Sequence, residues 1–85
     1  MFVTELTTDQ LHYHKESRSF SEEASALRMN WCSKQEIFKV TNPATKQSRD
    51  FVYRRTLYMG ASEDLDIGGW EYKSNDGLVL TIWND

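Results

Sequence analysis

Two histidines and a lone cysteine are the side chains of this sequence best suited to metal or nucleophilic chemistry. His12 and His14 stand two residues apart, so a strand would point both imidazoles to one face, where they could begin a metal site. A zinc or iron site needs three or four ligands, and beyond this pair the sequence offers Cys32 and carboxylates without motif spacing. We therefore expect no bound metal or other cofactor, and we keep a small metal-dependent enzyme at these three residues as the third alternative for function.

Cys32 is the only cysteine, which excludes an intramolecular disulfide bond. A reactive thiolate needs a positively charged neighbour, and no local pattern around Cys32 supplies one. We interpret this residue as a small, partly buried hydrophobic side chain. A small domain without disulfides fits a reducing compartment, so we expect the protein in the cytoplasm.

An acidic run, Glu63-Asp64-Leu65-Asp66, stands between Gly60 and the pair Gly68-Gly69. It lacks the alternating oxygen ligands and the closing glutamate of a calcium-binding loop. The glycines do not have the spacing of a phosphate-binding loop, and paired catalytic carboxylates need rigid elements to hold them apart. We interpret the run as a solvated surface loop, and the sequence predicts no enzyme active site.

Basic residues gather between Lys39 and Arg55, where five of them stand against one acidic residue. A basic strand with aromatic side chains is typical of single-stranded nucleic-acid binders, which stack bases beside arginines. The residues that would do this here are Lys46, Arg49, Tyr53 and Arg55. The whole chain has a net charge of −3, which opposes binding of a polyanion. We therefore interpret these side chains as the solvated face of a sheet and keep nucleic-acid binding as the alternative function.

Large aromatic side chains exceed the space that so small a core provides. Three Trp, four Tyr and four Phe occur in 85 residues, and each can bury roughly 150–250 Å². Several must therefore be partly exposed, and exposed Trp, Tyr and Arg are enriched at protein interfaces. The predicted strand register puts Arg54, Tyr58 and Trp83 on the outward face of the sheet as partner-binding residues. A helix from the first half of the chain covering that face is the competing interpretation, and a slip of one residue would reverse the assignment.

From Glu36 onward the hydrophobic period is two, which indicates strands with one buried face. The turn signals are Pro43 between the first two strands and Asn75-Asp76-Gly77 before the last. The pattern predicts an antiparallel meander of about four strands, at Glu36–Thr41, Phe51–Tyr58, Trp70–Ser74 and Leu78–Trp83.

Alternation within these strands assigns their faces. The predicted core positions are Phe38, Val40, Leu78, Leu80 and Ile82. In the second strand, strict alternation puts Phe51, Tyr53, Arg55, Leu57 and Met59 on one face and Val52, Arg54, Thr56 and Tyr58 on the other.

The first half of the chain has a mixed pattern. Ser19-Phe20-Ser21-Glu22 reads as a helix capping box, and Phe20, Ala24 and Leu27 recur at helical spacing, which predicts a helix over about residues 20–29. A bulged strand over Ala24 to Trp31 is the alternative for the same segment.

The elements together predict an α+β fold, in which the meander packs against one short N-terminal helix, with a small all-β barrel as the alternative. No linker or repeat divides the chain, so residues 1–85 are expected to form a single domain. The N-terminal residues lack the basic and apolar pattern of a signal peptide, and no window approaches 18 apolar residues, so we expect neither export nor membrane insertion.

The absence of a recognisable active site, combined with surplus aromatic side chains, predicts a non-enzymatic protein-interaction domain, such as an accessory subunit or a small inhibitor. It would act through the face that bears Arg54, Tyr58 and Trp83 or through an exposed sheet edge. Its partner would be another protein or a second copy of the chain.

Overall fold

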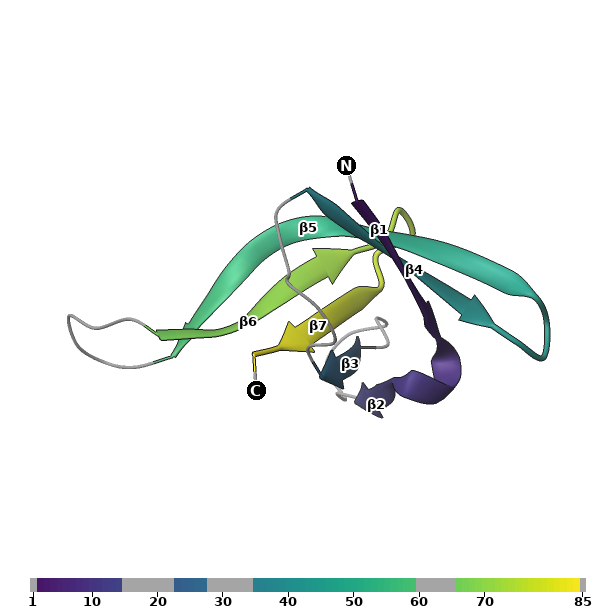
Figure 1. Ribbon diagram of the computed structural model, residues 1–85, viewed down its shortest axis with the longest axis horizontal. Coiled ribbons are helices and arrows are strands. Elements are labelled where there is room, and N and C mark those ends of the chain that lie inside the picture. Colours follow the sequence, from purple (N-terminus) through teal and green to yellow (C-terminus); the bar gives the residue numbers. More distant parts are fainter. Residues whose placement is uncertain (1, 15–22, 28–34, 60–65, 85) are drawn as a thin grey trace.

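Buried side chains alternate with more exposed ones along β4 (Glu36–Asn42) and β7 (Val79–Trp83) of the computed structural model, which describes residues 2–14, 23–27, 35–59 and 66–84. Within these residues the chain forms one seven-stranded sheet that curls into a half-barrel (Figure 1). The elements are β1 (Phe2–Thr7), the 3-10 helix η1 (Thr8–Gln10), β2 (His12–His14), β3 (Glu23–Leu27), β4 (Glu36–Asn42), β5 (Gln47–Met59), β6 (Asp66–Lys73) and β7 (Val79–Trp83).

The sheet is mixed, with the strand order β1-β4-β5-β6-β7-β3-β2. Strands β4 to β7 pair antiparallel in sequence order, and each of the two tight turns contains one residue with positive φ. Gly77 has a φ of 92° in the β6–β7 turn, and Lys46 has a φ of 59° in the β4–β5 turn. To this meander the N-terminal strands add two parallel pairs, β1 with β4 and β3 with β7.

The predicted α+β fold is wrong, because no α-helix occurs in the described part of the chain. The middle of the predicted helix is β3, and its capping box lies outside the described residues. Ala24 and Ala26 are both buried and lie opposite Leu80 and Ile82 of β7. Since residues two apart share a face only in a strand, pairing with β7 buries both small side chains, whereas a helix would separate them.

The two edge strands of the sheet, β1 and β2, are neighbours in sequence. The chain therefore crosses the open side of the half-barrel through η1, which Figure 1 shows as the purple turn between them. Leu6 and Leu11 flank this crossing and are buried, while the amide of Thr7 donates to Gln10 Oε1 at 2.8 Å. Both leucines belong to the hydrophobic core, whereas β1 and β2 form no ladder of hydrogen bonds with each other.

The core lies on the concave face of the half-barrel and centres on Tyr72, which is fully buried. Its ring makes edge-to-face contacts with Phe38, at 4.7 Å between ring centroids, and with Tyr53, at 6.0 Å. The predicted core positions Phe38, Val40, Leu80 and Ile82 are confirmed as buried.

A β-bulge at Arg54 changes the faces of β5. Tyr53 pairs with Tyr72 and Arg55 with Glu71, so Arg54 is an extra residue without a partner across the ladder. Thr56 consequently lies on the same face as Tyr53, whose hydroxyl is 2.7 Å from Thr56 Oγ1. The strict alternation predicted for this strand is therefore wrong beyond Tyr53.

We expect Leu6 to be essential for holding β1 against the sheet. Its side chain is only 2% exposed, whereas Val3 on the same strand is 58% exposed. Leu6→Ala should lower the free energy of unfolding by about 2–5 kcal/mol, because it leaves a cavity, and Val3→Ala should change it by less than about 0.5 kcal/mol. Urea denaturation of both variants measures the difference. Equal losses would show that β1 is not anchored through Leu6.

Candidate interaction surface

The far part of β5 extends beyond β4. Strand β4 covers β5 from Gln47 to Val52, while β6 pairs with β5 from Val52 to Met59. From Arg54 to Met59, β5 thus has β6 on one side and no described strand on the other. This two-stranded segment, which we call the arm (residues 54–59 and 66–70), projects from the body of the half-barrel in Figure 1.

Exposed apolar side chains gather on the arm. Tyr58 and Met59 are about three-fifths exposed, at 58% and 62%, and Ile67 pairs directly with Tyr58 and is also exposed. A free strand edge presents unpaired N–H and C=O groups, and natural proteins usually protect such edges. The arm therefore combines open backbone hydrogen-bonding groups with apolar side chains that a second strand could cover.

Trp83 lies at the base of the arm. Leu57, Gly69 and Trp83 stand opposite one another on β5, β6 and β7, so they form one row across the sheet. A Cβ on Gly69 would be 2.8 Å from the carbonyl oxygen of Ile82 and 3.3 Å from the Trp83 ring. The glycine thus provides the space in which the indole packs against β6.

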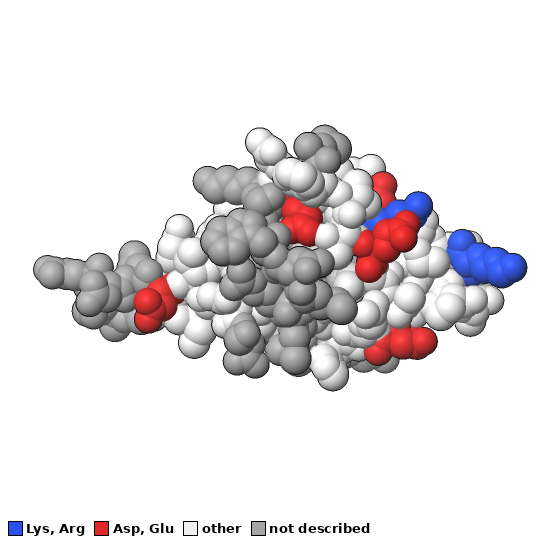
Figure 2. Space-filling view, in the orientation of Figure 1, with Lys and Arg blue, Asp and Glu red and all other residues white. Residues whose placement is uncertain are grey.

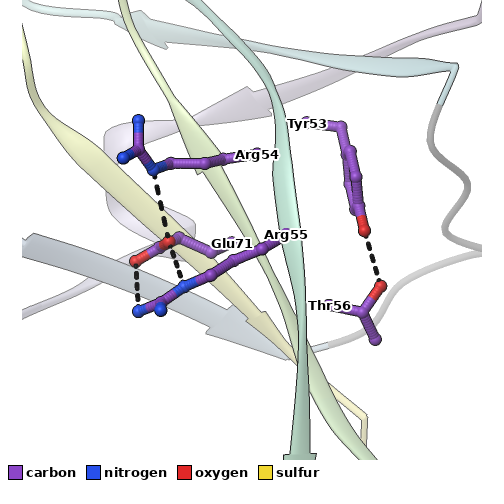
Figure 3. Close-up of polar contacts among 5 residues, drawn as sticks. All are labelled: Tyr53, Arg54, Arg55, Thr56 and Glu71. Atoms are coloured by element: carbon purple, nitrogen blue, oxygen red, sulfur yellow. Dashed lines mark hydrogen bonds and ion pairs between the residues drawn. The ribbon is translucent and has the colours of Figure 1, made fainter.

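Two arginines hold the other side of the arm base. Arg55 Nε is 2.7 Å from Glu71 Oε2, and Arg54 Nε is 3.9 Å from the same oxygen. Figure 3 shows both arginines reaching toward Glu71 on one side of β5, with Tyr53 and Thr56 on the other. The bulge is what puts two consecutive side chains on one side of the strand. Both arginines are largely exposed, so each pair contributes little to stability.

The residues predicted to bind a partner lie in one region. Arg54 and Tyr58 are both on the arm, and Trp83 is at its base. Their role in binding stays a prediction. The exposure of Met59 and Ile67 was not predicted, because the strand was expected to end at Tyr58 and Ile67 was assigned to a loop. The free edge was missed because it depends on where β4 begins relative to β5, which no local pattern encodes.

The residues named for nucleic-acid binding are spread along β5 and its turn. Lys46 is in the β4–β5 turn, Arg49 forms an ion pair with Asp76 at 2.9 Å, and the Tyr53 ring packs on Tyr72 inside the half-barrel. Arg55 lies on the other side of the strand beside Glu71. On the face drawn in Figure 2, acidic side chains are interspersed with the few basic ones, and no continuous basic band is present among the residues described.

At the end of the sheet opposite the arm, Asp76 sits in the β6–β7 turn. The hydroxyl of Ser74 donates to its carboxylate and lowers the pKa of Asp76 below its ordinary value, and the Arg49 guanidinium lowers it further. The amide of Leu78 donates in turn to Ser74 Oγ at 3.0 Å. The turn is therefore fixed by a short polar network that reaches across to β5.

The described residues offer no metal centre. Among them no three His, Cys, Asp or Glu side chains are close enough to hold a metal ion. The backbone of β2 places His12 opposite Ser25, and Cys32 lies outside the described residues. None of the helical segments in the described ranges has the length and apolarity needed to span a membrane.

Gly68 and Gly69 should respond differently to alanine. At Gly68 the added Cβ would meet the side chain of Met59, which is flexible and exposed, so Gly68→Ala should change the unfolding free energy by less than about 1 kcal/mol. At Gly69 the Cβ would meet backbone and the Trp83 ring, and overpacking there should cost about 1–3 kcal/mol. Chemical denaturation and tryptophan fluorescence measure both effects. A larger loss for Gly68→Ala would contradict the packing of Trp83 on Gly69.

The Asp76 carboxyl should titrate below the ordinary aspartate pKa of about 3.9. Because its pKa is lowered in the folded state, the carboxylate stabilises the fold at neutral pH, and this contribution is lost as the pH falls through the folded-state pKa. Carboxyl-detected NMR titration should show Ser74→Ala raising the midpoint more than Arg49→Gln does. The opposite order would make the ion pair, rather than the hydroxyl, the main cause.

No family model, curated protein or solved structure matches this chain. Its function is therefore inferred below from the geometry and chemistry of the described residues.

Proposed function

We propose that this chain is a non-enzymatic interaction domain that binds a partner strand along the free edge of β5, in the arm. The observation that carries the proposal is that β4 pairs with β5 only as far as Val52, which leaves Arg54–Met59 with a single partner strand, β6, among the residues that the structure describes. In strand addition, main-chain hydrogen bonds supply affinity and alternating side chains supply specificity. The arm offers both, since its edge is open and Tyr58 and Met59 are exposed on it.

The partner that fits the arm is a second copy of the same chain. Two β5 edges related by a twofold axis run antiparallel, and centring the axis near Thr56 or Leu57 brings the arginine end of one arm beside the Tyr58–Met59 end of the other. With the axis at Leu57, Arg55 of one arm lies across from Met59 of the other, on the same face, where the apolar stem of the arginine can pack on the methionine side chain.

The charges on the arm agree with this arrangement. Arg54 and Arg55 give its base two positive charges against Glu71, whereas Asp66, paired with Met59, puts a negative charge on its outer part. A twofold axis would bring the positive base of each arm near the negative outer part of its mate, which favours the antiparallel alignment.

Light scattering after size-exclusion chromatography, from micromolar to millimolar concentration, tests the proposal. We expect the wild-type chain to dimerise, and Tyr58→Lys or Met59→Lys to weaken the dimer by about tenfold or more, since like charges then face each other across a strand pair. Circular dichroism and urea denaturation confirm that each variant still folds.

Val3→Lys is the matched control, because Val3 is an exposed apolar residue on the other candidate edge, β1. It should leave the dimer unchanged. Dissociation by Val3→Lys but not by Tyr58→Lys would assign the interface to β1 and overturn the arm. A wild-type chain that stays monomeric at every concentration would overturn the assignment of a second copy as the partner.

A further inference from the structure

A pocket of about 480 Å³ opens at the end of the half-barrel opposite the arm. It lies where η1 and β2 face the start of β5 and the start of β7, at the side that the crossing chain spans. Its volume is within the range of sites that hold small organic molecules, about 300–1,000 Å³. The residues that line it are Thr8, Leu11, Tyr13, Ala24, Val40, Asn42, Thr45, Gln47, Ser48, Arg49, Phe51, Leu78 and Val79.

The pocket reaches the hydrophobic core. Four of its lining residues, Leu11, Ala24, Val40 and Phe51, belong to the buried cluster, with Phe51 only 4% exposed. A ligand that entered would therefore bury apolar surface against side chains that are already fixed in place. Burial of apolar surface contributes about 25 cal/mol per Å².

The rim of the pocket is polar, and the charge on it is positive. Arg49 is the one charged residue among the described residues of the lining, and it lies opposite Val40, on the same face as the buried floor. One of its nitrogens, Nη2, contacts Asp76 at 2.9 Å, and a guanidinium has five N–H donors, so donors remain for a second acceptor. Asn42 and Gln47 pair with each other at the next position along this face and add side-chain amides to the rim.

We infer that this pocket is a binding site for a small amphipathic anion, with an aromatic or branched apolar body and one carboxylate or sulfonate. The apolar body lies against Val40 and Phe51, and the anionic group accepts hydrogen bonds from Arg49 at the rim. Asp76 keeps the guanidinium at the rim by holding one of its nitrogens. The site is separate from the arm and does not depend on strand addition there.

Two fluorescent probes that differ in one group test the inference. 1-Anilinonaphthalene-8-sulfonate has the apolar body and the anion, and N-phenyl-1-naphthylamine has the same body without the sulfonate. We expect both to bind the wild-type chain with one-to-one stoichiometry. Arg49→Gln should weaken the sulfonate probe by about tenfold, the loss expected for one charge-assisted hydrogen bond, and leave the neutral probe unchanged.

Two further variants locate the site. Gln47 is exposed and shares the face of the pocket floor, so Gln47→Trp should cover the opening and weaken both probes without disturbing the core. Lys39→Gln also removes one positive charge, at a residue that does not line the pocket, and should alter neither affinity. NMR amide shifts caused by the sulfonate probe should fall on Val40, Arg49 and Leu78. Shifts confined to the arm, equal loss of both probes in Arg49→Gln, or no binding by the wild-type chain would each overturn the inference.

Discussion

The pairing of β5 with two different strands over two different stretches is the constraint on which the rest of the structure depends. Its first half pairs with β4 and forms one wall of the pocket, and its second half, which forms the arm, has β6 as its one partner among the described strands. The bulge at Arg54 lies where the first pairing has just ended. It turns both arginines to one side of β5, while Tyr53 and Thr56 are in contact on the other side.

The open side of the half-barrel has a related cause. Strands β1 and β2 are the sheet edges, and the short η1 crossing joins them in sequence without pairing them. Leu6 and Leu11 close the gap with apolar side chains, which need less regular geometry than a hydrogen-bonded ladder. Side chains therefore fill the half-barrel at its centre, around Tyr72, and leave a pocket at the end where the crossing passes.

Local pattern predicted the meander strands and the buried positions Phe38, Val40, Leu80 and Ile82, because alternation with a period of two is a property of neighbouring residues. It failed for β3, where two alanines and a leucine fit a helix equally well until β7 is available as a parallel partner 56 residues away. The bulge at Arg54 also has no local signature, since it arises from the register between β5 and β6. Arg54, Tyr58 and Trp83 were named from their chemistry, yet their grouping at the arm depends on that register.

The arm is braced in a way that a loosely attached hairpin is not. A two-stranded ribbon is only marginally stable in water, but here Trp83 packs on Gly69 at the base of the arm. The backbone amide and side-chain amide of Asn84 also donate to the carbonyl oxygens of Gly68 and Ile67, each at 3.0 Å, which occupies the edge of β6 where β7 has ended. One edge of the arm is thus covered by the chain itself, and on the opposite edge no described strand pairs with β5 from Arg54 to Met59. The edge of β6 is protected, and the strand that carries the other edge, β5, is held in place. This geometry suits strand addition, because an arm that is already ordered loses little conformational entropy when a partner strand binds.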